Sequence, residues 1–253
     1  MTASISVILT AWQRPQLLEE QVERVLDQSV EPCEIVLWYN APPKRFSLFE
    51  RKQMTSFKND QHVKKIICDH NFGIFPRFSL ATCMAGEYVC IFDDDTMPGS
   101  KWFENCLQYV DKHQVMLGTI GLRYLSTNNK AIQIEQPRKG WEGMNESLEY
   151  VDLVGHSWFF RREWARYLWN EEPVTRNYGE DIHFCAMLAK KGIRVACPPH
   201  PETDKELWGS VKAELGIDKV AISTWDKSDN AWLCVKTAIE NGYTPVLQRT
   251  IDE

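Results

Sequence analysis

Residues Tyr88 to Asp95 read YVCIFDDD, a run of five largely apolar residues that ends in three consecutive carboxylates. A short apolar run of this kind is typical of a buried strand, and carboxylates that leave such a strand are partly withdrawn from water. Burial and mutual repulsion raise the pKa of neighbouring carboxyl groups unless an opposite charge compensates. Mg²⁺ or Mn²⁺ would supply that charge, because oxygen ligands suit both ions. An acidic turn that caps the next helix is the structural alternative.

The segments before this run alternate between apolar strands and helical spacing of apolar residues. The predicted strands are 5–9, 34–38, 65–68 and 88–92, and the predicted helices between them are 15–28 and 78–84. This alternation predicts an α/β fold with a mostly parallel central sheet and helices on both faces. Ligands of such sheets bind outside the carboxyl ends of the strands, where the acidic triplet stands.

A further helix is predicted at 101–113, and the pattern after it is less regular. Later helices are predicted at 161–169, 181–191 and 230–240, the last capped by Asp229, and strands at 118–125, 151–154 and 193–197. The polar stretch 126–149 reads as a long loop of the kind that often carries binding residues. Neither a repeat nor a linker divides the sequence, so we expect a single domain over 1–253.

Composition narrows the class of protein. Of 253 residues, 43% are hydrophobic and 25% charged, which is ordinary for a globular protein, and the net charge of -6 disfavours a nucleic-acid partner. The eight cysteines form no metal or disulfide spacing and are expected to be free thiols. With neither a signal peptide nor an integral membrane segment recognisable, we expect a cytoplasmic protein.

A second acidic pair, Glu180 and Asp181, follows Gly179 at a predicted helix start. Carboxylates are favoured there by the helix dipole and need no function. In company with the first cluster, however, one acid group can hold a metal and a diphosphate while the other accepts a proton from an attacking hydroxyl. Group transfer needs this division of labour.

Taken in order, these elements resemble the nucleotide-sugar glycosyltransferases of the GT-A (Rossmann-like) fold, most nearly glycosyltransferase family 2. The matching segments are 6–15, 25–29 with 34–36, Asn71-Phe72-Gly73, Asp93-Asp94-Asp95 and Glu180-Asp181. The resemblance implies a metal-dependent hexosyl- or pentosyltransferase that moves a sugar from a nucleoside diphosphate sugar to an acceptor hydroxyl. The expected nucleotide is UDP. It further implies a nucleotide-sugar-binding half at 1–115 and an acceptor-binding half with the C-terminal helix at 116–253.

The same resemblance assigns roles to single residues. Asp93 and Asp95 would hold Mn²⁺ or Mg²⁺ as a DXD-type pair, and Asp94 would face the ribose or sugar of the donor. The nucleotide would be lined by Thr10, Ala11, Arg14 and Asn40. Many members end the second strand in an acid that contacts the base, whereas this chain has Asn40 there.

Residues 35–40 together with 93–96 also look like exostosin-type transferases, which retain anomeric configuration. By that resemblance Asn71 and Arg77 would contact the donor. If family 2 governs, Asp181 is the catalytic base of an inverting reaction and Glu180 supports it or contacts the acceptor. If the exostosin type governs, Asp181 stabilises the anomeric carbon, and the sequence leaves both open.

Three residues of the second half complete the candidate site. His200, on a proline-flanked loop, is a candidate third metal ligand, because such transferases often take a histidine from this part of the chain. Trp158 and His156 are candidates for acceptor binding, with a place in the core or a structural hydrogen bond as the alternative. The acceptor itself, a glycan, a lipid-linked molecule or another hydroxyl compound, is not readable from the sequence.

Two other classes of protein share parts of this pattern. A sugar nucleotidyltransferase also binds a metal through paired Asp residues, but it normally has a glycine-rich phosphate loop that residues 11–15 lack. An inactive carbohydrate-binding module of the same fold would have lost the acidic triplet or the Glu-Asp pair, and both are present. An active transferase is therefore the favoured interpretation.

Overall fold

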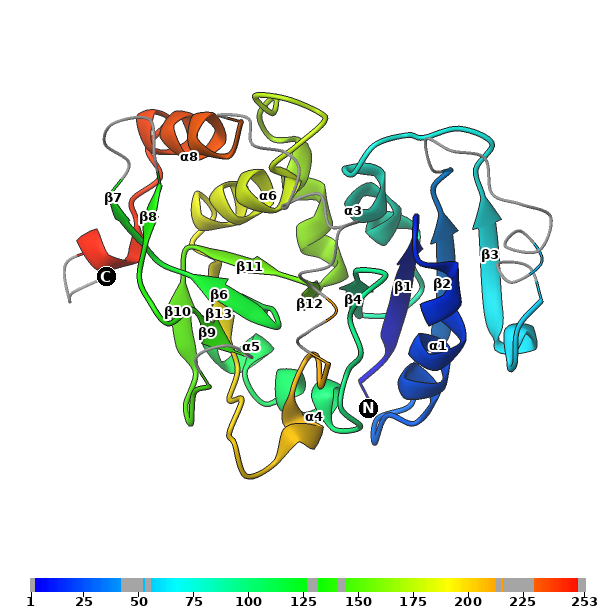
Figure 1. Ribbon diagram of the computed structural model, residues 1–253. Helices are drawn as coiled ribbons and strands as arrows, with labels where there is room; N and C mark the ends of the chain where they lie inside the picture. The colour runs from blue at the N-terminus through cyan, green and yellow to red at the C-terminus, as the bar shows by residue number, and fades with distance from the viewer. Residues whose placement is uncertain are drawn as a thin grey trace.

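The computed structural model describes residues 3–41, 52, 56–126, 132–140, 144–212, 215 and 230–249. Its main element is an eight-stranded sheet in the order β10-β13-β5-β12-β4-β1-β2-β3 (Figure 1). These strands are β1 (Ile5–Ala11), β2 (Glu34–Tyr39), β3 (Val63–Ile67), β4 (Tyr88–Phe92), β5 (Val115–Leu117), β10 (Glu149–Val151), β12 (Ser157–Arg161) and β13 (Arg194–Cys197). The adjacent strands β4, β1 and β2 are almost wholly buried, as their continuous apolar runs predict.

The sheet is parallel where the sequence shows strand–helix alternation and mixed beyond it. Strand β1 pairs in parallel with β2 and β4, and β2 pairs in parallel with β3. Strand β12 runs antiparallel to both β4 and β5, whereas β13 and β5 are parallel. The predicted mostly parallel α/β sheet is confirmed, and the antiparallel β12 joins its two halves.

Helices flank this sheet in Figure 1, with α3, α6 and α8 at the top of the view and α4 and α5 below. The α-helices are α1 (Leu18–Leu26), α3 (Pro76–Leu80), α4 (Trp102–Leu107), α5 (Val110–His113), α6 (Glu180–Ala189) and α8 (Asn230–Glu240). Helix α6 packs against α8 and against the 3₁₀ helix Arg162–Trp169. The predicted helix 101–113 is divided into α4 and α5, and the predicted helix 161–169 has 3₁₀ geometry. Asp229, the predicted cap of α8, lies outside the described residues.

The predicted loop 126–149 contains two short strands, β8 (Gln133–Ile134) and β9 (Lys139–Gly140). The predicted strand 118–125 is divided into β6 (Ile120–Leu122) and β7 (Tyr124–Ser126). Strand β6 pairs with β9 and with β11 (Leu153–Gly155), and β7 pairs with β8. Residues 127–131 and 141–143 of the predicted loop are outside the described residues. These small sheets stand beside the end of the main sheet that carries β10 and β13 in Figure 1.

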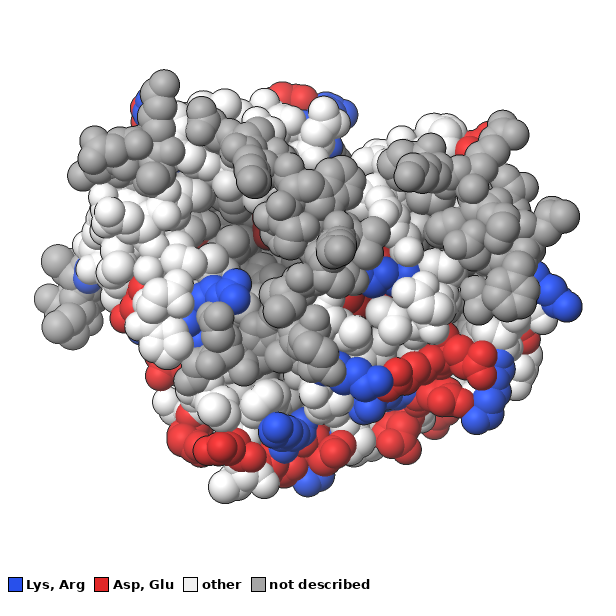
Figure 2. Space-filling model, in the orientation of Figure 1, with Lys and Arg blue, Asp and Glu red and all other residues white. Residues whose placement is uncertain are grey.

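The distribution of surface charge and the free state of the cysteines agree with the expectations from the sequence. Figure 2 shows basic and acidic side chains interspersed along the lower part of the face in view. All eight cysteines are free thiols, and six of them are buried. Among the described residues, none of the helices has the length and apolar character that crossing a membrane requires.

Candidate functional site

The acidic loop, defined as residues Asp93 to Thr96, follows β4, and a side chain of α1 holds its backbone. Gln21, only 1% exposed, donates from Nε2 to the carbonyls of Asp93 (2.7 Å) and Thr96 (2.8 Å). The hydroxyl of Thr10 donates to the carbonyl of Phe92 at 2.8 Å. Satisfied backbone groups fix the loop, so its carboxylates have defined positions at the carboxyl end of the sheet.

Asp94 closes the loop that follows β1. Its Oδ1 lies 2.5 Å from Nη1 of Arg14, and its Oδ2 accepts the backbone N–H groups of Trp12 and Gln13 at 3.3 and 3.2 Å. Burial raises the pKa of Asp94, and the charge of Arg14 opposes that rise. Both oxygens of Asp94 are thus engaged within the protein, and its expected contact with the donor ribose or sugar stays a prediction.

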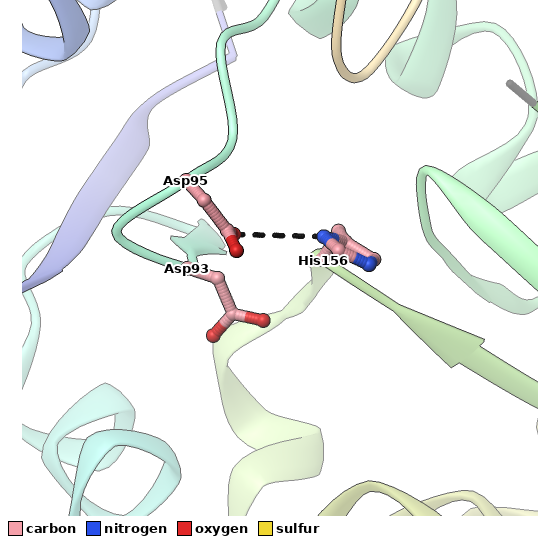
Figure 3. Close-up of side chains that lie close together, drawn as sticks. All are labelled: Asp93, Asp95 and His156. Atoms are coloured by element: carbon pink, nitrogen blue, oxygen red, sulfur yellow. Dashed lines mark ion pairs between the residues drawn. The ribbon is translucent and has the colours of Figure 1, made fainter. Parts of the chain in front are cut away.

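Asp93 and Asp95 converge with His156 rather than with Asp94. One ligand atom from each of the three lies within 4.8 Å of the other two (Figure 3). Nδ1 of His156 is 3.6 Å from Oδ1 of Asp95, and the other oxygen of Asp95 lies 3.2 Å from Nη2 of Arg14. Two carboxylates and an imidazole are a donor set for a divalent transition ion, so these residues fit the predicted cation.

His156 reaches this position through the tight turn between β11 and β12. Its φ is +65°, a left-handed conformation that side-chain-bearing residues seldom adopt. Its carbonyl accepts the N–H of Asp93 at 3.0 Å and the hydroxyl of buried Thr96 at 2.8 Å. The turn is therefore attached directly to the acidic loop, and it holds His156 beside Asp93 and Asp95. The contact of His156 with the acceptor stays a prediction.

His200 does not join the carboxylates, which corrects its prediction as the third metal ligand. It is fully buried between the rings of Trp102 and Trp208, at centroid distances of 5.6 and 5.9 Å. Nδ1 donates to the carbonyl of Pro198 (2.8 Å) and Nε2 accepts the N–H of Gly209 (3.2 Å). Burial lowers the pKa of His200 to about 4. This histidine is a neutral, fully hydrogen-bonded core residue.

Arg77 connects the acidic loop to the start of α6. Its guanidinium bridges the carboxylates of Asp93 and Glu180, with 2.5 Å between Nη2 and Oε1 of Glu180. The charges of these carboxylates raise the pKa of Arg77 although burial opposes the rise. Arg77 was predicted to contact the sugar donor. In the structure, two of its N–H groups bind Asp93 and Glu180 and so link the two acidic clusters.

Trp158 lies beneath this bridge. It is 1% exposed, donates from Nε1 to the carbonyl of Val154 at 3.0 Å, and packs edge-on against Phe78. The guanidinium of Arg77 stands 4.5 Å from the centre of its ring. The prediction that Trp158 stacks on an acceptor sugar is corrected, because its ring is buried and the guanidinium of Arg77 covers it.

Glu180 and Asp181 open α6 as predicted, behind Gly179. The φ of Gly179 is +74°, and a Cβ at this position would come within 2.7 Å of Sγ of Cys234, so glycine is required on both counts. Oδ1 of Asp181 accepts the N–H of Ile182 at 2.7 Å. Burial, followed by the charge of Glu180, raises the pKa of Asp181 to about 7. Burial also raises the pKa of Glu180, against the charge of Arg77.

The predicted nucleotide-side residues meet at the ends of β1 and β2. Nδ2 of Asn40 donates to Oδ1 of Asn71 (2.8 Å) and to the carbonyl of Gly73 (2.9 Å), while its Oδ1 accepts the N–H of Phe72 (2.8 Å). Ala11 is buried and its carbonyl accepts the N–H of Asn40 at 3.0 Å. Asn40 and Ala11 therefore shape this edge of the sheet, and Asn71 is the exposed member.

Sequence reasoning missed Gln21 and Thr96, which position the acidic loop without offering a ligand. A signal for Gln21 existed, because it shares the buried side of α1 with Leu18, Val22 and Val25. A lone amide among the apolar residues of a helix needs a hydrogen-bond partner. Thr96 carries no comparable signal, since its partner is sixty residues further along the chain.

Replacing Arg77 with Gln is expected to lower the free energy of unfolding by about 3 kcal/mol, because two neighbouring carboxylates lose their shared counter-charge. The control is Arg176→Gln. Arg176 lies 2.7 Å from Glu172 and both side chains are largely exposed, so we expect the free energy of unfolding to fall by less than about 1 kcal/mol. Urea unfolding of both variants measures the difference. Equal losses would contradict a bridging function for Arg77.

Three solved structures share this architecture. The mannosyltransferase PcManGT from Pyrobaculum calidifontis, in complex with GDP-Man and Mn²⁺, has a TM-score of 0.55 and 14% identity over 81% of this chain and 59% of its own. GalNAc-T7 with UDP, GalNAc and Mn²⁺ has a TM-score of 0.60 and 12% identity over 78% of this chain and 43% of its own. S. aureus TarS gives 0.54 and 15%, covering 78% of this chain and 35% of its own. These likenesses confirm the predicted GT-A fold.

Sequence comparison gives the family. A curated relative, an uncharacterized glycosyltransferase of Haemophilus influenzae (strain ATCC 51907 / DSM 11121 / KW20 / Rd), is 24% identical over 110 residues. The match covers 43% of this chain and 33% of the relative, so it spans about a third of that protein. The model of the family described as glycosyl transferase family 2 matches residues 6–169, which is more than half of the 253 residues. The chain therefore belongs to glycosyl transferase family 2.

Proposed function

We propose that this glycosyltransferase moves a sugar from a nucleoside diphosphate sugar, UDP-linked in the first instance, to an acceptor hydroxyl, with inversion of configuration. Residues 1–115 would bind the donor and residues 116–253 the acceptor, within a single domain. Asp93, Asp95 and His156 would hold a divalent cation, and Asp181 would be the base. Bound there, the cation supplies positive charge to the departing diphosphate.

One observation carries this proposal: the guanidinium of Arg77 joins the carboxylate of Asp93 to that of Glu180. A transferase needs its cation and its base on either side of one reacting centre, and this bridge brings the two acidic clusters of the sequence into one site. Two solved structures of similar fold, one in complex with GDP-Man and Mn²⁺ and one with UDP, GalNAc and Mn²⁺, support the nucleotide and the metal of this proposal.

The acid–base chemistry of Asp181 supports its assignment as the base. A general base works best when its pKa lies near the working pH, and that of Asp181 is raised to about 7 by burial and by Glu180. The carboxylate of Glu180 is engaged by Arg77, so we assign Glu180 to positioning. A retaining reaction, with Asp181 as stabiliser, would be identified by anomeric analysis of the product.

Other finer expectations remain parts of the proposal. Asn40 and Asn71 are bonded to each other, and of the two only Asn71 is exposed, so we assign Asn71 to contact the nucleotide. Arg14 and Thr10 would support the loops beside it. The free thiols of the chain support a reducing compartment such as the cytoplasm. The acceptor could be a glycan, a lipid-linked molecule or another hydroxyl compound.

A donor screen tests the proposal. We expect a UDP-sugar to raise the melting temperature in the presence of Mn²⁺ and to do so much less after chelation, because a ligand of the folded state stabilises it by mass action. Release of the nucleoside diphosphate on addition of acceptor candidates measures transfer. GDP-sugars are included, and a response to these alone would replace UDP as the donor nucleotide. Stabilisation that is indifferent to Mn²⁺ for every donor would contradict the metal-dependent function.

A further inference from the structure

We propose that Asp152 is a positioning residue of the transferase, which fastens the C-terminal segment to the sheet and thereby holds α8 over the start of α6. The C-terminal segment consists of residues 242–249, which follow α8. In Figure 1 it leaves the end of α8 and lies beside β7. The inference rests on the proposed function, because the proposed base, Asp181, lies at the start of α6.

The carboxylate of Asp152 joins separate parts of the chain. Asp152 stands between β10 and β11 and is 2% exposed. Its Oδ2 accepts the N–H of Tyr124 at 2.7 Å, and its Oδ1 accepts the hydroxyl of Tyr243 at 2.6 Å and the N–H of Val246 at 2.7 Å. Burial raises the pKa of Asp152, and these hydrogen bonds oppose the rise. Because hydrogen bonds to a carboxylate are strong, Asp152 fastens the C-terminal segment to the sheet.

Tyr243 connects this anchor to α8. Gly242, whose φ is +94°, ends the helix, and its N–H donates to the carbonyl of Ile239 at 2.9 Å. The N–H of Tyr243 donates to the carbonyl of Ala238, also at 2.9 Å. Together these two bonds form a Schellman motif, which ties the last turn of a helix to the residues that follow it. Helix α8 can therefore leave the sheet only if this cap opens or Tyr243 separates from Asp152.

Helix α8 has little buried surface of its own. Of its eleven residues, only Cys234 and Val235 are buried. A cavity lined by His183 and Met187 of α6 and by Thr237 of α8, among others, lies where the two helices meet. Helices in proteins owe most of their stability to the packing of a buried face. Since this face is small, the position of α8 depends on the anchor beyond its end.

The buried part of α8 lies against the residue that precedes α6. A Cβ at Gly179 would come within 2.7 Å of Sγ of Cys234. Burial, followed by the charges of Asp181 and Glu180, raises the pKa of Cys234 to about 11, so the thiol faces both carboxylates. If α8 separated, the turn that orients Asp181 would lose its support. Proton abstraction depends on that orientation, because the base must lie within hydrogen-bond reach of the acceptor hydroxyl.

Tyr243→Phe tests the inference, because it removes one hydroxyl and keeps the buried ring. We expect the kcat of transfer from the UDP-sugar found in the donor screen to fall about tenfold, while the KM for that donor stays within about twofold. The modification of Cys234 by a thiol reagent, followed by mass spectrometry, should become about tenfold faster, since this thiol is 7% exposed in the wild type. Asp152→Asn should have the same two effects, because an amide N–H would then face one of the three donors.

Two further variants make the test specific. The double variant of Asp152→Asn and Tyr243→Phe should have the kcat of Asp152→Asn alone, because both changes remove one anchor. Tyr88→Phe is the matched control. The hydroxyl of Tyr88 also donates to a carboxylate at 2.6 Å, that of Asp111, but Tyr88 begins β4, at the opposite end of the strand from the acidic loop. This variant should lower the melting temperature and leave both the kcat and the modification of Cys234 unchanged.

Contrary results have separate meanings. Variants that lower the melting temperature but change neither the kcat nor the modification of Cys234 would make Asp152 a purely structural residue and overturn the inference. Faster modification with an unchanged kcat, or an equal fall of kcat in Tyr88→Phe, would overturn the positioning of Asp181 by α8. A wild-type protein that transfers no sugar from any donor would overturn the proposed function instead. The modification of Cys234 would then still decide whether Asp152 holds α8.

Discussion

Asp181→Asn is expected to lower the turnover of sugar transfer by about 10³-fold, within the range that a positioned general base contributes. The substitution preserves the shape of the side chain, and its amide oxygen can still accept the N–H of Ile182. We therefore expect donor binding in the presence of Mn²⁺ to stay within about threefold of the wild type. The new side chain has the same shape, and the residues assigned to the donor and the cation are unchanged. Steady-state kinetics and titration calorimetry with the donor measure the two effects.

The pH profile separates a base from a merely structural residue at this position. A base acts in its deprotonated form, so wild-type kcat/KM should rise with pH until the pKa of Asp181 is passed and fall about tenfold per pH unit below it. That pKa is raised to about 7, and a nearby cation would move it downward because positive charge favours the carboxylate. The residual activity of Asp181→Asn should lack this limb. An unchanged profile, or unchanged turnover, would refute the assignment.

Asp95→Asn is expected to lower transfer by about 10³-fold at modest Mn²⁺ concentration, since a metal supplies several kcal/mol of charge stabilisation. The cause is weaker binding of the cation, so raising the Mn²⁺ concentration should restore part of the activity. Metal titration of the rate measures this recovery. Asp181→Asn should not recover, because its defect lies in proton transfer.

The control for Asp95→Asn is Asp204→Asn. Asp204 forms an ion pair with Lys101 at 3.0 Å on the surface, and its loss should leave transfer unchanged. Because Asp95 also pairs with Arg14, thermal unfolding of the variant must show a folded protein before its rate is interpreted. A rate for Asp95→Asn that equals the wild-type rate at every Mn²⁺ concentration would remove Asp95 from the cation site.

Local sequence patterns predicted the strands and helices whose apolar residues follow a regular spacing or a continuous run. The apolar runs of β1, β2 and β4 and the helical spacing of α1 gave the α/β sheet, because burial on both faces demands continuous apolar residues. The same reasoning placed the acidic loop at a strand end and the Glu-Asp pair at a helix start, where polar groups follow buried segments. The 3₁₀ helix after β12 and the division of residues 101–113 lay beyond these patterns.

The sequence by itself thus determined the class of fold, the two acidic clusters and the residue types available for a cation and a base. Only the tertiary structure decided which histidine accompanies the carboxylates, and why Trp158 and Asp94 are occupied within the protein. The partners that bring the two acidic clusters and the histidine together lie about sixty to more than a hundred residues apart, as with Asp95 and His156 or Arg77 and Glu180. Their meeting depends on an antiparallel strand inserted beside β4 and on a left-handed turn, and neither leaves a periodic trace in the chain.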